Sequence, residues 1–277
     1  MRKGALIAVS SAYQSGSSVV AIRRVVTAST ASGRPRLRGS HRATVGWTPV
    51  DDLWMRPLKH GYTNHTVGDG SVVEKTYAGP DAELRRAREY AVLTRLRGAL
   101  PVPPVRGLEN GILTLGFVTG TPGQELVEAG HAARVLEACG TLLRRIQETS
   151  PGVLEAGAHE AGTVLVHGDF GPNNMLLDPV TFQVTAVVDW EFAHLGRPVE
   201  DLAWCEWIVR MHHPGHRQEL HRLFSAYGGP VPGWPVRQAA MLDKCAALER
   251  FCHRWQPNGP GVSQWQRRAA ATAGWQE

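Results

Sequence analysis

The sequence predicts an α+β protein in two parts, a small antiparallel sheet carrying one helix and, after it, a mostly helical region. Three observations predict this class. Short apolar runs alternate with glycine turns after Trp47, an apolar stripe at helical spacing fills residues 131–149, and the patterns beyond Glu200 are mostly helical. The 277 residues suffice to bury one large core or two modest ones.

The sheet is predicted from strands separated by turns. Residues 57–67 are typical of two strands joined at a glycine turn around Gly61, and Gly68-Asp69-Gly70 favours a second tight turn. Residues 71–77 alternate as a strand does, so every second side chain shares one face. That face carries Val73, Lys75 and Tyr77.

One helix and a further strand complete this part. Asp81 is predicted to cap a helix that runs to about Arg97, with apolar side chains at Tyr90, Leu93 and Leu96. The segment Pro101–Pro104 ends the helical pattern, and residues 112–118 form the next predicted strand.

The helical part is predicted to begin after the turn cluster at residues 119–123. A core helix over residues 131–149 follows, and residues 164–166 lead into a polar loop. Residues 175–177 and 184–188 are predicted to be two strands of a hairpin. We therefore expect a boundary near residue 119, with one lobe over residues 46–119 and a second over residues 120–277.

The first 45 residues carry little periodicity and are predicted to be a disordered or non-native extension. A targeting or binding arm is the alternative, although the apolar run after Lys3 is shorter than the ~7–15 residues of a signal sequence. Residues 1–50 hold eight of the 30 basic residues and no acidic one, which leaves 22 basic and 25 acidic residues, a net charge of −3, in residues 51–277. This mildly acidic body argues against nucleic-acid binding.

Composition limits the remaining classes of protein. No stretch approaches the ~18 apolar residues of a membrane span, and we expect no membrane partner. The four cysteines show neither paired CxxC spacing nor a zinc pattern, which favours reduced thiols and a cytoplasmic protein. We expect a monomer or weak dimer.

The chemistry is predicted from residues 167–174 and 189. Asn174 stands just before the first strand of the predicted hairpin and Asp189 just after the second, so antiparallel pairing brings them to the same end. Asp169 lies on the preceding loop, which can fold over that end. Oxygen ligands of this kind suit Mg²⁺ held together with substrate phosphates.

A cation that binds phosphate is the expected complement. Lys75 is the basic residue on a well-formed strand of the sheet, and Glu89 on the following helix can hold it by an ion pair. The backbone at Gly61 can approach phosphates closely.

These segments, in this order, resemble the aminoglycoside phosphotransferase family, which includes choline-kinase-like and other small-molecule kinases of the protein-kinase-like fold. The similarity covers about residues 55–210. Its motifs are Gly61–Asn64, Lys75, Glu89–Leu96, Leu100–Val105, Val166–Asp178, Val187–Glu191 and Pro198–Ala203. The resemblance implies a two-lobed protein-kinase-like fold with a small antiparallel-sheet N-lobe and a mostly helical C-lobe.

The resemblance also implies roles for individual residues. Asp169 would accept or orient the proton of the attacking hydroxyl, Asn174 and Asp189 would hold Mg²⁺ on ATP, and Lys75 paired with Glu89 would contact the α- and β-phosphates. Adenine would bind backbone atoms near Phe117–Thr119. The glycine loop is sparse, so phosphate binding at Gly61 is the weakest match, and the HRD, DFG and APE signatures of protein kinases are missing.

The expected activity is ATP- and Mg²⁺-dependent phosphorylation of a hydroxyl on a small molecule, plausibly an aminoglycoside antibiotic, which implies antibiotic resistance. Choline, a sugar or another antibiotic remain open as acceptors, and so does a catalytically silent nucleotide-binding protein of the same fold. Residues 189–206 hold five carboxylates against one arginine, Arg197, which permits a cationic acceptor without requiring one.

Several neighbouring residues carry more than one interpretation. His167 is expected to brace the loop rather than transfer protons, Asp201 to cap a helix or support the site, and Glu191 to lie either behind the site or in solvent. Trp204 and Trp207, three residues apart, are expected in the core, with stacking on a substrate ring as the alternative.

Overall fold

The computed structural model describes residues 55–57, 64–154 and 160–277. The predicted N-terminal extension (1–45) and Gly61 with its turn lie outside the described residues. Residues 58–63 and 155–159 are the gaps between these ranges. Among the described helices, none combines the length and apolar character that crossing a bilayer requires.

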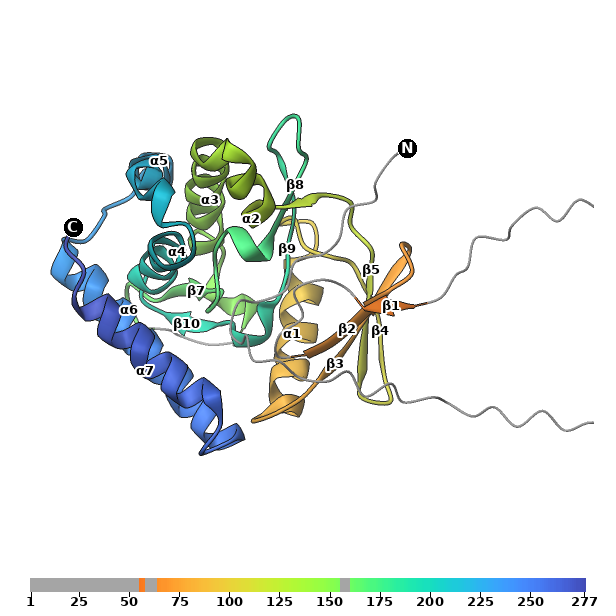
Figure 1. The fold of residues 1–277 in the computed structure, drawn as a ribbon. Helices are drawn as coiled ribbons and strands as arrows, with labels where there is room; N and C mark the ends of the chain where they lie inside the picture. The colour runs from red at the N-terminus through yellow and green to blue at the C-terminus, as the bar shows by residue number, and fades with distance from the viewer. Residues whose placement is uncertain (1–54, 58–63, 155–159) are drawn as a thin grey trace, which may run out of the picture.

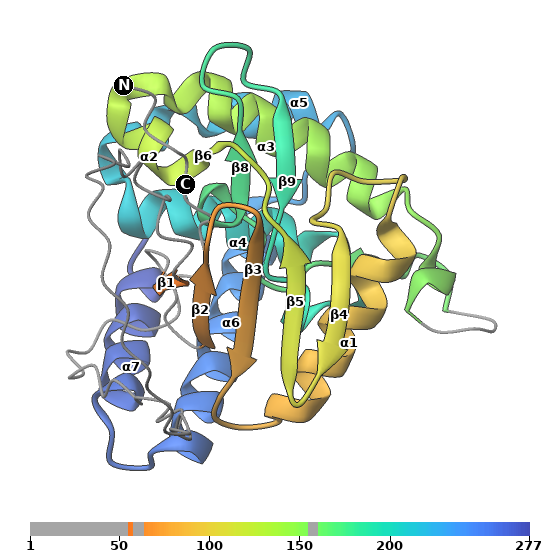
Figure 2. The same cartoon turned by 90° about the vertical axis from the view of Figure 1, so that its right-hand side faces the viewer.

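A five-stranded antiparallel sheet with one helix forms the first part, here called the sheet lobe (Figures 1 and 2). The strand order is β1-β2-β3-β5-β4, and α1 lies between the sheet and the rest of the molecule. Its elements are β1 (Arg56–Pro57), β2 (Asn64–Gly68), β3 (Val72–Tyr77), α1 (Ala82–Leu96), β4 (Val105–Glu109) and β5 (Ile112–Gly116).

The described residues from Thr121 onward form the helical lobe. Its strands are β6 (Thr121–Pro122), β7 (Val164–Val166), β8 (Met175–Leu177), β9 (Val184–Val187) and β10 (His194–Gly196). Its α-helices are α2 (Gly123–Leu126), α3 (Ala132–Gln147), α4 (Val199–His212), α5 (Leu220–Tyr227), α6 (Trp234–Trp255) and α7 (Pro260–Ala273). Short helical turns are η1 (Val127–His131), η2 (Pro151–Val153), η3 (Pro172–Asn174), η4 (Trp190–Phe192) and η5 (Pro214–Glu219).

Alternating burial explains why β3 can deliver a charged side chain to the interior. Val73, Lys75 and Tyr77 are buried on one face, as the alternation predicts, while Thr76 on the other face is exposed. β3 pairs with β2 and β5 on its two sides, so its backbone hydrogen bonds are made within the sheet. Lys75 is thereby held on the face that α1 covers.

The hairpin of β8 and β9 forms as predicted. Met175 pairs with Val187, and the Val188 N–H donates to the Asn174 carbonyl oxygen at 3.0 Å. Position 174 is therefore next to position 188, one residue before Asp189. The ends of the two strands deliver both predicted metal ligands to one place.

Several short strands were not predicted, among them β4 and β10, whose sequences lack alternation. β4 contains Gly107 and has no fully buried residue, while β10 is only three residues long and pairs with β7. Asp81 occupies the N-cap position of α1, but the prediction that its side chain caps the helix is wrong. Asp81 precedes the helix at φ 55°, makes no capping hydrogen bond, and binds Arg254 of α6 at 2.7 Å instead.

The helix α6 reaches from the helical lobe to the sheet lobe at the turn between β3 and α1. The Trp255 ring packs on Gly79 so closely that a Cβ atom there would lie 2.6 Å from it, and Gly79 has φ 78°. The neighbouring Arg254–Asp81 ion pair joins the same two segments. The lobes therefore touch at this outer turn as well as at the site described next.

Candidate active site

The loop from His167 to Asp169 is held by Asp201 at the start of α4. The two carboxylate oxygens of Asp201 accept hydrogen bonds from the backbone N–H groups of His167 (2.6 Å) and Gly168 (2.9 Å). Burial raises the pKa of Asp201 to about 6, against the opposing effect of these two N–H donors. Gly168 has φ 84°, and a Cβ atom there would lie 2.4 Å from the Phe192 carbonyl oxygen, so only glycine fits. The supporting role that the resemblance implied for Asp201 matches this geometry.

His167 is fully buried and braces the same loop. Its Nδ1 accepts the Asp169 N–H at 3.2 Å, so the other nitrogen, Nε2, carries the proton and donates to the Val188 carbonyl oxygen at 3.0 Å. Burial lowers the pKa of His167 to about 4. The imidazole therefore links the Asp169 loop to the end of β9 as a neutral group.

This burial predicts a pH dependence of stability. Between pH 6.5, the ordinary histidine pKa of the unfolded chain, and about 4, the unfolded state binds one more proton at His167 than the folded state. The stability that the neutral imidazole contributes is therefore present above pH 6.5 and is lost as pH falls toward 4. Since Asp201 titrates in the opposite sense, the wild type is compared with His167→Gln by urea unfolding at pH 7, 6, 5 and 4. The stability difference between them should shrink by about 3 kcal/mol across that range, and a constant difference would contradict the assignment.

The carboxylate of Asp169 is held by two donors from opposite sides. The Asn174 amide N–H₂ donates to its Oδ2 at 2.9 Å, and the Trp204 indole N–H donates to its Oδ1 at 2.8 Å. Asp169 and Trp204 are 5% and 2% exposed. These contacts fix the orientation of the carboxylate without neutralising its charge.

The hydrogen bond from Trp204 to Asp169 was not predicted, although a signal existed. Asp201 and Trp204 are three residues apart on α4 and so share one face of that helix, which faces the 167–169 loop. The expectation of core packing is confirmed, since the Trp204 and Trp207 rings stack at 4.3 Å with an interplanar angle of 8°. The hydrogen bond to Asp169 is an additional function of the same side chain.

A buried cluster of charges joins the two lobes beside Asp189. Lys75 Nζ lies 2.6 Å from Glu89 Oε2 and also binds Asp189 Oδ1, so the Lys75–Glu89 ion pair that the resemblance implied is present. The Tyr77 hydroxyl donates to the same oxygen of Glu89, and the Trp190 N–H donates to its Oε1 at 3.2 Å. Burial acts to lower the pKa of Lys75, but the carboxylates of Asp189 and Glu89 outweigh it and hold that pKa well above its usual value.

Glu191 forms the second half of this cluster. The side chain is fully buried, accepts from the Arg85 guanidinium at 2.5 Å, and accepts from the Asn64 amide at 2.9 and 3.0 Å. Burial raises its pKa to about 7. Of the two interpretations left open by the sequence, the solvent-facing one is wrong. Arg85, on α1, is the partner that the sequence did not predict.

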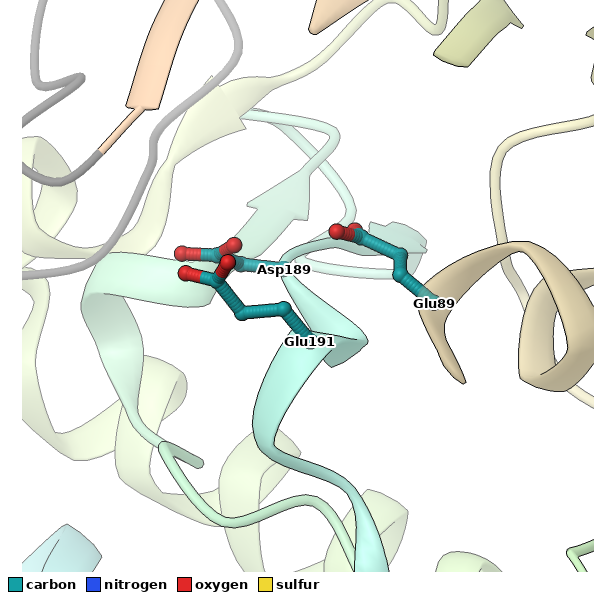
Figure 3. Close-up of side chains that lie close together, drawn as sticks. All are labelled: Glu89, Asp189 and Glu191. Carbon is teal, nitrogen blue, oxygen red and sulfur yellow. The ribbon is translucent and has the colours of Figure 1, made fainter. Parts of the chain in front are cut away.

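Oxygen atoms of Glu89, Asp189 and Glu191 lie within 4.8 Å of one another, which is a spacing that a metal ion could use (Figure 3). Figure 3 shows Glu89 reaching in from α1 while Asp189 and Glu191 come from the segment after β9. The ion pairs to Lys75 and Arg85 already balance two of the three negative charges. This trio is therefore better described as an ion-pair network than as a metal site.

Asn174 and Asp189 fit a divalent cation better. The Asn174 amide nitrogen is used by Asp169, while its Oδ1 is fully buried and has no hydrogen-bond partner among the described residues. A buried carbonyl oxygen without a donor is costly unless a cation or water satisfies it. Asp189 adopts the left-handed conformation, φ 69° and ψ 52°, a strained backbone typical of functional sites.

The residues predicted to bind adenine lie between the two lobes. Phe117 is partly buried and its N–H donates to the Ser71 carbonyl oxygen at 2.9 Å, whereas Thr119 is exposed. Their role, like those of Lys75, Glu89, Asp169, Asn174 and Asp189, stays a prediction.

Comparison with known proteins was made on sequence and on structure. Residues 152–240 match the model of the family described as "Phosphotransferase enzyme family", and this range contains Asp169, Asn174 and Asp189. Among curated proteins, "Acyl-CoA dehydrogenase family member 11" of Rattus norvegicus is 37% identical over 103 residues, which are 30% of this chain and 13% of the rat protein. The match thus spans about an eighth of that relative's length.

Solved structures resemble the whole fold at low sequence identity. A choline/ethanolamine kinase family protein from Mesorhizobium loti has a TM-score of 0.56 at 16% identity, covering 81% of this chain and 88% of the other. Macrolide 2'-phosphotransferase MphH from Brachybacterium faecium has a TM-score of 0.55 at 19% identity, covering 82% and 94%. Wild-type aminoglycoside 2'-phosphotransferase-IIIa, as its GDP complex, has a TM-score of 0.62 at 12% identity, covering 81% and 93%. The resemblance to aminoglycoside phosphotransferases and the two-lobed kinase-like fold are confirmed.

Proposed function

We propose that this protein is a phosphotransferase that moves the γ-phosphoryl group of ATP to a hydroxyl of a small molecule. The observation that carries the proposal is the convergence at one point of Asp169, Asn174, Asp189 and Lys75, which come from two lobes. The family match over residues 152–240 supports the same reaction class. Residues 46–119 would form the nucleotide-binding lobe and residues 120–277 the catalytic and acceptor-binding lobe.

In this proposal Asp169 takes the proton of the acceptor hydroxyl. The hydroxyl oxygen forms a bond to the γ-phosphorus, the bond from that phosphorus to the β,γ-bridging oxygen breaks, and ADP leaves with its electron pair. The donors Asn174 and Trp204 hold the Asp169 carboxylate in one orientation, so little reorganisation is needed when the hydroxyl arrives. Lys75 supplies a fixed positive charge for the phosphates.

Asn174 Oδ1 and the Asp189 carboxylate would hold Mg²⁺. The ion neutralises phosphate charge when it is bound with the nucleotide. The chain itself prepares this place by keeping Asn174 Oδ1 buried and aimed away from Asp169, and by holding Asp189 with Lys75.

The direct test is a coupled assay of ADP release with purified protein, ATP and Mg²⁺, run over a panel of hydroxyl compounds that includes aminoglycosides, choline and sugars. Turnover that depends on one acceptor supports the proposal. Nucleotide binding without turnover on any hydroxyl compound would favour a silent binding protein of the same fold.

Asp189→Ala should weaken binding of Mg²⁺·ATP by ~10-fold or more, because it removes a charged oxygen from the proposed metal site. The measurement is a calorimetric titration with and without Mg²⁺. Asp178→Asn is the matched control at the opposite end of the same hairpin, where Asp178 Oδ1 accepts the turn N–H groups of Val180 and Thr181 and the Thr181 hydroxyl. Equal titration curves for the Asp189 variant and the wild type would remove Asp189 from the metal site.

A further inference from the structure

A cavity of about 310 Å³ opens beside the Asp169 loop, in the helical lobe. Gly168 and Asp201 line it on the loop side, Glu200 and Trp204 come from α4, and Asp243 and Lys244 come from α6. This volume is at the lower end of the range for small-molecule sites.

The cavity is connected to Asp169 through two of its lining residues. Gly168 directly precedes Asp169 in the chain, and Trp204 donates its indole N–H to Asp169 Oδ1 at 2.8 Å. The other oxygen, Oδ2, is turned to Asn174. Asp169 does not itself line the cavity. Its carboxylate lies between Trp204, which does, and the proposed metal ligand Asn174, so an acceptor in the cavity would approach it on the Trp204 side.

The carboxylates around this cavity are mostly committed to groups of the protein. Both oxygens of Asp201 accept backbone N–H groups. Glu200 accepts from the Arg197 N–H at 2.7 Å and from His194 Nε2 at 2.8 Å, and its hydrogen bond raises the pKa of His194. Only Asp243 is exposed and without an ion-pair partner among the described residues that line the cavity.

The cations of the same cavity, in contrast, bind no carboxylate directly among the described residues. Lys244 Nζ donates to the Gly168 carbonyl oxygen at 2.5 Å and lies 5.3 and 5.7 Å from the ring centres of Phe192 and Trp204. Within the part of the chain that the structure describes, neither Lys244 nor Arg197 forms an ion pair with a side chain. Burial lowers the pKa of Lys244 although the carboxylates of Asp169, Asp201 and Glu200 act to raise it, and a further anion beside it would offset more of that cost. The oxygens of Asp201 and Glu200 thus already accept hydrogen bonds, while Lys244 and Arg197 keep N–H donors that a ligand can use.

We propose that the acceptor is a small hydroxy compound that carries a carboxylate group, which Lys244 binds with help from Arg197 while the hydroxyl reaches Asp169. This inference rests on the proposed function and names its acceptor class. A polycationic acceptor would meet the like charges of Lys244 and Arg197, and of the carboxylates in the described lining only Asp243 keeps both oxygens for its N–H groups. The phosphoryl transfer itself is as written above, with the carboxylate unchanged.

The test measures kcat/KM for hydroxy carboxylates of three to six carbons, each paired with its own primary amide and with an amino alcohol of matched length, using ATP and Mg²⁺. The acids are expected to exceed their amides by ~10-fold or more, which is the size of one charge-assisted hydrogen bond. In Lys244→Met the ratio of acid to amide should fall by ~10–100-fold, and Lys244→Arg should restore part of it. Asp243→Asn should raise kcat/KM for the acids.

The ratio separates binding of the carboxylate from a purely structural role. If Lys244 only braces the Gly168 carbonyl, Lys244→Met lowers the rates for acid and amide equally, the ratio is unchanged, and the proposal is overturned. Arg250→Met is the matched control, since Arg250 is exposed on the same helix and does not line the cavity. It should leave both rates and their ratio as in the wild type.

Failure of the acceptor class and failure of the proposed function give different results. Preference for amides or amino alcohols overturns the carboxylate proposal while the phosphotransferase stands. A second result would also overturn the carboxylate proposal. In it, the protein binds Mg²⁺ with a non-hydrolysable ATP analogue, but no hydroxy carboxylate binds to that complex in a calorimetric titration and none is phosphorylated with ATP. Absence of both nucleotide binding and turnover instead rejects the proposed function.

Discussion

Replacing Asp169 with alanine is expected to lower kcat by ~10²–10⁴-fold while the affinity for Mg²⁺·ATP stays nearly unchanged. The reason is geometric, because the carboxylate is held by Asn174 and Trp204 of the helical lobe, while Lys75, the residue proposed to bind the phosphates, is held by Glu89. Single-turnover rates and a nucleotide titration measure the two quantities separately.

Asp169→Asn is the control for shape. It keeps an oxygen that can accept from Asn174 or Trp204 but removes the negative charge, so the loop should stay in place while the proton acceptor is lost. We expect a loss of the same order as for alanine. Turnover near the wild-type value in either variant would show that another group takes the proton.

The substitution Lys75→Met is expected to have the second large effect. It should lower the stability of the fold and also weaken nucleotide binding. The change removes one cation from between Glu89 and Asp189, which are 1% and 2% exposed. Removing one partner of a buried ion pair costs ~3–5 kcal/mol because the remaining charge stays buried. Urea unfolding should show this loss, together with weaker binding of Mg²⁺·ATP.

The matched control breaks an exposed ion pair at the start of α1, the helix that carries Glu89. Arg254→Met removes the contact with Asp81, where both side chains are about half exposed and solvent already screens the charges. Its unfolding midpoint should stay close to that of the wild type. If Lys75→Met were equally mild, the cluster around Asp189 would not contribute to stability as described.

The sequence predicted the site best where strand geometry alone determines position. Alternation placed Lys75 on the buried face of β3, and hairpin pairing placed Asn174 beside the end of β9. Both inferences need only local periodicity and the rules of antiparallel pairing. The unpredicted strands β4 and β10 lack such a pattern.

Contacts between distant segments could not be predicted in the same way. Arg85 and Glu191 are 106 residues apart, and nothing in either local pattern links them. The five carboxylates of residues 189–206 illustrate the same limit. Counted along the chain they suggest an acidic surface, yet four are buried and the fifth, Glu200, is bonded to His194. Their charges are therefore largely used within the protein.

Asp81, Arg85 and Glu89 restrict how the two lobes can move apart around the proposed nucleotide site. They are spaced four residues apart at the start and along one face of α1, and each binds the helical lobe, through Arg254, Glu191 and the Trp190 N–H. Hinged rotation of the sheet lobe as a rigid body would break all three contacts and leave Arg85 and Glu191 as separated buried charges. Entry and release of a nucleotide at the proposed site are therefore expected to leave in place both α1 and the part of β3 that Lys75 and Tyr77 join to Glu89, and to bend the other strands of the sheet.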